Sequence, residues 1–361
     1  MFTPAFRITP GITRALMQIE ACRQAVLDLP IDVALLQSLR ETARVASIHF
    51  STMIEGNRLT EPQVREVLQG ARFPGRERDE AEVRNYFRAL AWVETQADAQ
   101  TRISPLIRIG DVKRLHGLAF HGRNRGTPFR DGQNVIRDTG SGRIVYLPPE
   151  APDVPGLMQD LMAWVAAELD RADLPAPIIA ALAHYQLATI HPWYDGNGRT
   201  ARLLATLILQ RASYGLKGLY SLDAYYAEDL PAYYGALAIG PSHNYYEGRA
   251  EADLTGFVGY FCAGMAEAFA KVRAAAAGAG SRGAKDQAAR LRQLDPRQRR
   301  VLELFRARAS ATSVEIAACL GLKPRTVVAL CRGWVAEGFL ELADASRKKR
   351  EYRLGEGFEG T

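Results

Sequence analysis

The segment His191-Pro-Trp-Tyr-Asp-Gly-Asn-Gly-Arg-Thr-Ala-Arg202 decides how the centre of this chain folds. Apolar residues recur at helical spacing in residues 177–190 before it and in residues 200–211 after it. This pattern predicts a tight loop that joins two helices. A helix N-terminus has unpaired backbone N–H groups and the positive end of the helix dipole. Because Gly196 and Gly198 let an anion approach without a Cβ in the way, the sequence predicts an anion cradle there.

Charged side chains beside the cradle indicate chemistry on a phosphate. Arg199 and Arg202 lie three residues apart, so they share a helix face and can hold further phosphate oxygens. Asp195 suits Mg²⁺, which takes one or two carboxylates and fills its other positions with water and phosphate oxygens. His191 is placed to take a proton from an incoming hydroxyl. The residues by themselves therefore predict phosphoryl or nucleotidyl transfer.

The segment resembles the signature of the Fic protein family, HPFx(D/E)GNGRxxR. Gly198 stands where the phosphate-transferring Doc branch has lysine. This favours the nucleotidyl-transferring majority of the family, in which AMP moves from ATP to a protein hydroxyl. Trp193 replaces the family's phenylalanine, and we expect its indole N–H to need a hydrogen-bond partner.

The resemblance implies a protein adenylyltransferase with ATP and Mg²⁺ as its ligands, and it leaves open whether the protein also removes AMP. His191 would be the base for a Ser, Thr or Tyr hydroxyl of a protein target. Asp195 would bind Mg²⁺, and Arg199 and Arg202 would hold the rest of the triphosphate. The phosphates would also be bound by the backbone amides around Gly196, Asn197 and Gly198.

A second motif lies far upstream, where Ser51, Glu55 and Gly56 match the inhibitory pattern (S/T)xxxE(G/N) of Fic proteins. Residues 35–54 read as a helix that ends near Gly56, so Ser51 and Glu55 share one face. We expect Glu55 to pair with Arg199 and so take the guanidinium that the γ-phosphate needs. This would be the class in which the inhibitory helix precedes the core. The alternative is an ordinary helix C-terminus.

Two further regions carry expectations from the family. Residues 134–146 read as a short β-hairpin with a turn-rich centre. In Fic proteins such a flap binds a target segment as an added strand, which assigns this role to Ile144, Val145 and Tyr146. Tyr233 and Tyr234 are candidates for an adenine pocket. The alternatives are a surface hairpin without a partner and aromatic residues of the core.

Composition indicates an ordinary globular protein. The chain has 361 residues, of which 47% are apolar and 24% charged, and no apolar run approaches membrane-spanning length. The N-terminus lacks the apolar core of a signal peptide. The four cysteines are scattered without metal or redox spacing. We therefore expect a cytoplasmic protein with reduced thiols and no membrane partner.

The C-terminal part differs in charge from the rest. Residues 281–361 hold 17 Lys and Arg against 10 Asp and Glu, a net charge of +7 in a chain of +6. Residues 312–340 read as helix, turn at Gly321, second helix from Pro324 and a strand near Phe339, and Arg347-Lys-Lys-Arg350 follows. This order resembles a winged helix-turn-helix, a fold that binds DNA or serves in protein interaction and dimerisation.

We thus expect a mainly α-helical protein with a Fic-type helical core, a small β-hairpin flap and a C-terminal winged helix-turn-helix domain. The domains would be an N-terminal helical region with the inhibitory motif (1–105), the Fic catalytic core (106–272), a linker (273–290) and the winged helix-turn-helix (291–361). Two functions compete. One is an adenylyltransferase inhibited by Glu55, whose tail aids target choice or homodimer formation. The other is a DNA-binding transcriptional regulator whose core senses nucleotides or modifies itself.

Overall fold

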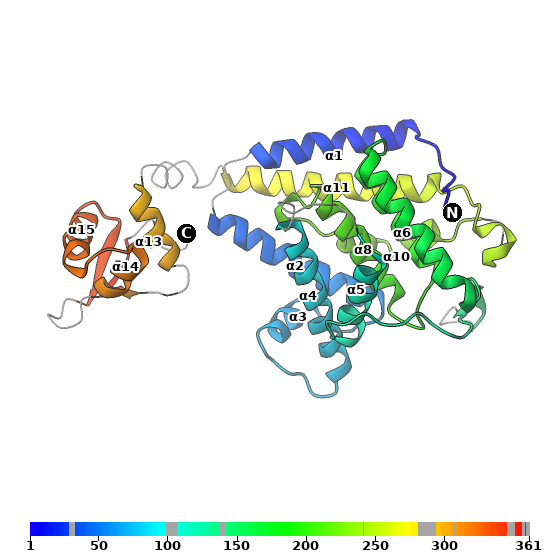
Figure 1. Ribbon diagram of the computed structural model, residues 1–361, viewed down its shortest axis with the longest axis horizontal. Helices are drawn as coiled ribbons and strands as arrows, with labels where there is room; N and C mark the ends of the chain where they lie inside the picture. The colour runs from blue at the N-terminus through cyan, green and yellow to red at the C-terminus, as the bar shows by residue number, and fades with distance from the viewer. Residues whose placement is uncertain are drawn as a thin grey trace. The chain divides into compact units, whose positions relative to one another are not determined.

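The computed structural model describes residues 1–28, 33–98, 107–137, 142–240, 242–280, 294–305, 310–344 and 351–355, and the single residues 308 and 358. The chain divides into two compact units. The first comprises residues 1–28 and 39–274, and the second comprises residues 29–38 and 275–361 (Figure 1).

The first unit is built from helices around one central helix. Fourteen of the fifteen residues of α7 (Ala176–Ile190) are buried. A helix that is apolar on every side belongs in the middle of a core, and α7 packs between α6 and α8. The other helices are α1 (Pro10–Asp28), α2 (Val33–Ile54), α3 (Glu61–Leu68), α4 (Glu77–Asp98), α5 (Ile109–His121), α6 (Val154–Arg171), α8 (Asn197–Arg211), α9 (Leu222–Glu228), α10 (Leu230–Leu237) and α11 (Thr255–Gly280).

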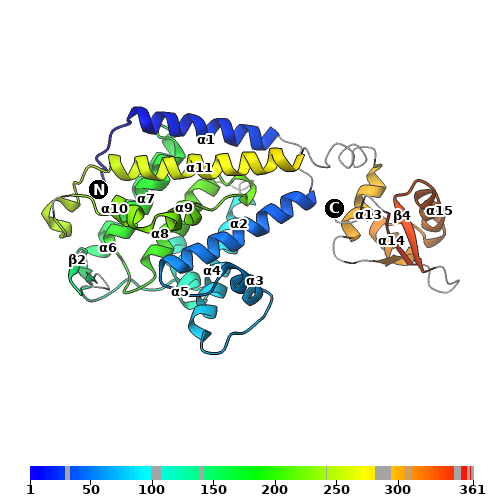
Figure 2. The ribbon, with the colours of Figure 1, turned by 180° about the vertical axis from the view of Figure 1, so that it is seen from behind.

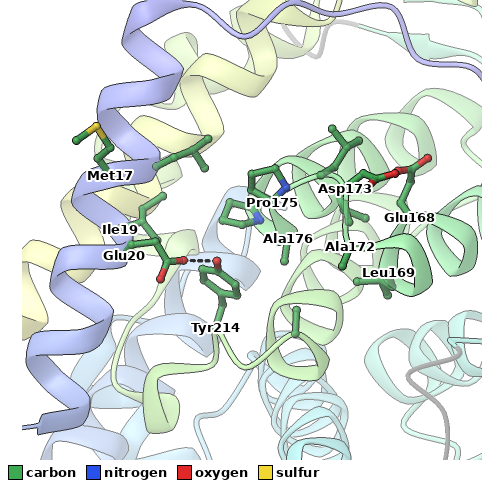
Figure 3. A pocket seen from close by; sticks show the side chains of 15 residues that line it. Met17, Ile19, Glu20, Glu168, Leu169, Ala172, Asp173, Pro175, Ala176 and Tyr214 are labelled. Atoms are coloured by element: carbon green, nitrogen blue, oxygen red, sulfur yellow. Dashed lines mark hydrogen bonds between the residues drawn. The ribbon is translucent and has the colours of Figure 1, made fainter.

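The N-terminal helix α1 lies beside α11 in both views (Figure 1, Figure 2). An open groove of about 710 Å³ separates α1 from the connection between α6 and α7. Figure 3 shows this groove, with Met17 and Ile19 on one side and Pro175 on the other. The Tyr214 hydroxyl donates a hydrogen bond to Glu20 at the end of the groove, which ties α1 to the loop after α8.

The predicted flap is present as two short strands. β1 (Ile136–Arg137) pairs antiparallel with β2 (Ile144–Tyr146), and residues 138–141 at the expected turn lie outside the described residues. Figure 2 shows β2 at the edge of the first unit. The hydroxyl of Tyr146 donates to the backbone oxygen of Thr189, 2.7 Å away, and this fastens the flap to the end of α7.

The second unit has its own small core. Its elements are α13 (Pro296–Phe305), β3 (Ala311–Thr312), α14 (Ser313–Leu320), α15 (Pro324–Ala336), β4 (Leu340–Asp344) and β5 (Glu351–Leu354). The antiparallel sheet has the order β3-β5-β4, and Trp334, Phe339 and Tyr352 lie in the core. Thr312 and Glu315 form a capping box at the start of α14, and Gly321 ends it with a φ of +67°. The basic run of residues 347–350 lies outside the described residues.

The first residues of the expected linker, 273–280, belong to a helix. Helix α11 continues through Gly280, so residues 273–280 are helical, and residues 281–290 lie outside the described residues. Four consecutive alanines at 274–277 explain this difference, because alanine has the highest helix propensity.

Within the described residues no helix is long and apolar enough to cross a membrane. The four cysteines are free thiols, three of them buried.

Gly117 of α5 lies at a position where the first unit is tightly packed. A Cβ at this position would collide with the backbone oxygen of Arg125 in the loop that follows α5. We expect Gly117→Ala to lower the free energy of unfolding by about 1–3 kcal/mol, as overpacking does. Gly156 of α6 is the matched control, since no heavy atom lies within 4 Å of its ideal Cβ. Gly156→Ala should be neutral or stabilising by up to about 1 kcal/mol. Urea titration compares the two, and equal stabilities would contradict the expected collision.

Candidate functional site

The predicted loop between two helices is present, running from the end of α7 to the start of α8. His191 caps α7 in the left-handed region with a φ of +53°, and Gly196 precedes α8 with a φ of +78°. The side chain of Asn197 closes the loop. Its Nδ2 donates to the backbone oxygen of Trp193 at 2.8 Å, and its Oδ1 accepts from the backbone N–H of Trp193 at 2.9 Å. The side chain of Asn197 is thus engaged within the loop, and its backbone N–H lies at the start of α8, where an anion can approach.

His191 is held as a neutral acceptor. Its Nδ1 lies 3.3 Å from the backbone oxygen of Ala188. A carbonyl oxygen only accepts, so Nδ1 carries the hydrogen and Nε2 keeps a free lone pair. Burial lowers the pKa of His191 to about 4. The imidazole is thus uncharged at neutral pH and able to accept a proton through Nε2.

Arg130 holds the backbone of His191 through a hydrogen bond. The sequence did not indicate this role. Its Nε donates to the backbone oxygen of His191 at 3.0 Å, and its Nη1 donates to the backbone oxygen of Gly132 at 3.0 Å. Its Nη2 donates to the backbone oxygen of Pro149, and its backbone N–H donates to the backbone oxygen of Pro192. One buried guanidinium thus joins the loop to both sides of the flap. The signal available was an arginine shortly before the predicted hairpin, but the sequence said nothing of its partners.

Arg199 is buried without a full set of partners. It is 2% exposed, and its Nε and Nη1 have no hydrogen-bond partner among the described residues. The nearest carboxylate oxygens belong to Asp195 and Glu82, at 3.6 and 4.0 Å. Its guanidinium carbon lies 5.3 Å from the centre of the Phe120 ring. A buried cation with unused donors is costly unless an anion joins it, so this position suits a negatively charged ligand.

The expected ion pair between Glu55 and Arg199 is wrong, because Glu55 pairs with Arg202 instead. Its Oε1 accepts from Nη2 of Arg202 at 2.9 Å. Ser51 joins them, since its Oγ accepts from Nε of Arg202 and its backbone oxygen from Nη2, both at 2.9 Å. Helix α2 ends at Ile54 as predicted, and Gly56 turns the chain with a φ of +93°.

Helix geometry explains the change of partner. Residues three apart on a helix point about 60° away from each other. Arg199 therefore points at Phe120 of α5, whereas Arg202 points at the end of α2. The Glu55 carboxylate also lies against the cradle, since a Cβ at Gly198 would collide with its Oε1. Glu55 thus occupies space at the N-terminus of α8 that an anion would use.

Arg202 has a second acidic partner that nothing in the sequence marked. Oδ1 of Asp223, in α9, lies 3.0 Å from Nε of Arg202. Burial raises the pKa of this carboxyl, and the charge of Arg202 opposes that rise. The two partners of Arg202 differ in exposure, because the Glu55 side chain is 24% exposed and that of Asp223 is 7% exposed.

Asp195 lies at the open side of the loop. Its side chain is 50% exposed, and its Oδ1 accepts from the backbone N–H of Gly196 at 2.5 Å. Among the described residues no group of three or more His, Cys, Asp or Glu side chains is arranged to hold a metal ion. A single exposed carboxylate beside an anion cradle still suits Mg²⁺, which completes its coordination with phosphate and water.

The two candidates for the adenine pocket, Tyr233 and Tyr234, differ in exposure. Tyr233 is 2% exposed; its hydroxyl lies 3.0 Å from Nε2 of His184, and its ring stacks on Tyr226. This is a core position, as the alternative interpretation proposed. Tyr234 is 49% exposed and donates to the backbone oxygen of Ile54 at 3.3 Å.

The three candidates in the flap also differ in exposure. Ile144 and Val145 are 41% and 40% exposed, whereas Tyr146 is buried and anchors the strand. The indole N–H of Trp193, for which we expected a partner, has none among the described residues.

Comparisons with known proteins agree with this geometry. Residues 106–209 match the family model described as Fic/DOC family. Two relatives, from Drosophila willistoni and Drosophila ananassae, are each called protein adenylyltransferase Fic. Each is 31% identical over 205 residues, which cover 56% of this chain and 39% of the relative. The chain therefore spans less than half the length of these curated relatives.

Solved structures show the same fold. A Fic family protein from Desulfovibrio desulfuricans G20 superposes with a TM-score of 0.60 at 25% identity, covering 98% of this chain and 99% of that one. Residues 134–508 of Fic-1 from C. elegans superpose with a TM-score of 0.58 at 25% identity, covering 74% of this chain and 73% of that one. The part of the helical core that holds α7, α8 and the loop at 191–202 thus matches the Fic/DOC family model and shares the fold of these solved structures.

Proposed function

We propose that this protein is an adenylyltransferase that moves AMP from ATP to the hydroxyl of a Ser, Thr or Tyr residue in a protein target. The observation that carries the proposal is the buried Arg199, whose guanidinium has unused donors beside the N-terminus of α8. Nε2 of His191, a free proton acceptor, belongs to the same loop. The names of the Drosophila relatives support the same activity.

The residues present fit ATP with Mg²⁺. The backbone N–H groups of residues 196–198 and the guanidinium of Arg199 would hold phosphate oxygens, and Asp195 would hold the metal ion. Bound Mg²⁺ would neutralise phosphate charge and help to orient the polyphosphate. Tyr234 remains the exposed candidate for the adenine site, and Ile144 and Val145 remain the exposed candidates for target binding.

The chemistry follows from the state of His191. Its Nε2 takes the proton of the target hydroxyl as that oxygen forms a bond to the α-phosphorus of ATP. The bond between the α-phosphorus and the bridging oxygen to the β-phosphate breaks, and pyrophosphate leaves with the electron pair. Arg199 and the amides of α8 stabilise the charge on the phosphate oxygens during this in-line displacement.

Glu55 would restrain this reaction. The γ-phosphate of a productively bound ATP needs Arg202, and Glu55 holds that guanidinium in the ion pair described above. Its carboxylate also lies against Gly198, where a phosphate would approach the helix. ATP and Glu55 therefore compete for one cation, and activity depends on the displacement of Glu55.

Removing the imidazole of His191 should separate the binding of Mg²⁺-ATP from the transfer of AMP. We expect His191→Ala to retain binding of Mg²⁺-ATP, because the phosphate contacts remain, and to lose AMP transfer. His243→Ala is the control, since His243 is exposed and contributes only its backbone oxygen to the contact with Leu147. Calorimetry measures binding, and mass analysis after incubation with labelled ATP measures transfer. Equal labelling by the wild type and His191→Ala would exclude the proposed base.

Removing the inhibitory carboxylate should increase self-labelling. A charged hydrogen-bonded contact contributes roughly 1.5–3 kcal/mol, so Glu55→Gly should raise labelling by on the order of tenfold to a hundredfold at limiting ATP. Glu55→Gln, which keeps the size but not the charge, should fall between. The double change Glu55→Gly with Arg202→Ala should cancel the gain, because the γ-phosphate then lacks its cation. A Glu55→Gly protein no more active than wild type at every ATP concentration would remove Glu55 as the inhibitor.

The second unit supports a second proposal, a winged helix-turn-helix that contacts DNA. The helix pair α14 and α15 with the following antiparallel strands has the element order of this fold. Lys323 and Arg325 are exposed at the start of α15, where a recognition helix would meet phosphates. The regulator function, homodimer formation and a cytoplasmic location stay predictions of the sequence, and the removal of AMP stays open.

Salt dependence tests the DNA contact. We expect Lys323→Ala with Arg325→Ala to weaken binding to duplex DNA and to reduce the log-log salt slope by about 0.9 per lost phosphate contact. Arg297→Ala, an exposed cation at the start of α13, should leave the slope unchanged. Fluorescence anisotropy over a salt series gives the slope. If the intact protein does not bind duplex DNA at low salt, the unit is a protein-recognition module instead.

A further inference from the structure

Helix α5 presents an aromatic surface to the signature loop. The ring of His116 stacks on Trp193 with centroids 4.2 Å apart and an interplanar angle of 6°. It also stacks on Phe120, one turn further along α5, with centroids 5.5 Å apart. Since the indole N–H of Trp193 has no partner among the described residues, Trp193 contributes here through its ring face.

His116 also makes a directed hydrogen bond to the loop. Its Nε2 lies 2.9 Å from the backbone oxygen of Asp195, and its Nδ1 lies 2.7 Å from Oγ1 of Thr127. Because a carbonyl oxygen only accepts, Nε2 must carry the hydrogen, and Nδ1 then accepts from the Thr127 hydroxyl. The imidazole is 3% exposed, so water does not compete strongly for either contact.

We propose that His116 is a positioning residue that sets the direction of the Asp195 carboxylate through the peptide unit that joins Asp195 to Gly196. The carbonyl of Asp195 and the N–H of Gly196 are the two ends of one planar peptide unit. Fixing the oxygen on His116 therefore fixes the opposite direction of the N–H. That N–H donates to Oδ1 of Asp195, so the carboxylate is oriented through the same unit.

The close approach of His116 also explains why glycine stands at 196. A Cβ there would lie 3.1 Å from Nε2 of His116 and 3.2 Å from Cδ2 of Phe120, and the φ of +78° disfavours any side chain. The loop thus rests directly on α5. The effect of His116 on nucleotide binding rests on the proposed function, whereas its effect on loop order does not.

Two variants separate the hydrogen bond from the stacked ring. His116→Phe keeps an aromatic ring but removes the donor to Asp195, and His116→Gln keeps an N–H donor near the position of Nε2. We expect His116→Phe to speed hydrogen exchange in the peptide spanning 191–199, and His116→Gln to restore most of the protection. In a His191→Ala background, which tests binding alone, His116→Phe should raise the Kd for Mg²⁺-ATP by about threefold to tenfold. Thermal unfolding checks that each protein is folded.

The outcomes distinguish this proposal from the proposed function. Unchanged exchange in folded His116→Phe, or equal loss of protection in both variants, would overturn the positioning role. Faster exchange in His116→Phe alone would support it even if the wild type binds no ATP and transfers no AMP, in which case the proposed function fails by itself. Should His116→Phe not fold, Thr127→Val removes the hydroxyl that contacts Nδ1, together with its longer contact of 3.5 Å to the backbone oxygen of Lys113. Faster exchange of the 191–199 peptide in that variant would then support the proposal, and unchanged exchange would overturn it.

Discussion

The structure depends on the burial of two guanidinium groups at the positive end of one helix. Arg199 and Arg202 both lie in the interior beside the N-terminus of α8, where the helix dipole adds to their positive charge. Buried cations of this kind need anions close by. The chain supplies Arg202 with Glu55 and Asp223 but leaves donors of Arg199 unused. An incomplete charge balance in an otherwise well-packed core is what makes this region the candidate binding site.

The difference in exposure between the two partners of Arg202 would give the proposed site a means of control. Asp223 is buried in α9 and can stay with Arg202 when a ligand arrives. Glu55 follows the last turn of α2, is partly exposed, and can leave without unfolding a helix. An arginine that always keeps one carboxylate is easier to release from the other, because the second carboxylate meets a cation that is already partly neutralised. Under the proposed function, the contact between Glu55 and Arg202 would therefore be both specific and reversible.

Neighbouring side chains hold the loop at 191–196, where the proposed reaction would take place, on several sides. Asn197 closes it internally, Arg130 holds the backbone of His191, and His116 holds the backbone of Asp195. Each of these contacts acts on the main chain and leaves the reactive side chains free. Such support fixes the positions of a base, a carboxylate and a cradle without occupying the groups that would meet a substrate. Tyr146 extends the same principle to the flap, whose buried hydroxyl bond leaves Ile144 and Val145 exposed.

The sequence by itself determined the local features of this protein. The two helices around 191–202, the glycine that begins α8 and the end of α2 near Gly56 all follow from residues close together in the chain. Helical periodicity and glycine conformation depend on neighbours, so a linear pattern is enough to predict them. The order of helices and strands in the second unit was readable for the same reason.

Only the tertiary structure decided which arginine Glu55 meets, because the pair joins residues 147 positions apart. Arg199 and Arg202 are equivalent in the sequence motif, and the packing of α2 and α5 on different sides of α8 distinguishes them. The same holds for Tyr233 and Tyr234, adjacent residues of which one is buried and one exposed. Arg130, His116 and Asp223 act through contacts between distant segments. Such contacts form only when the chain packs. For this reason no local sequence pattern indicated them.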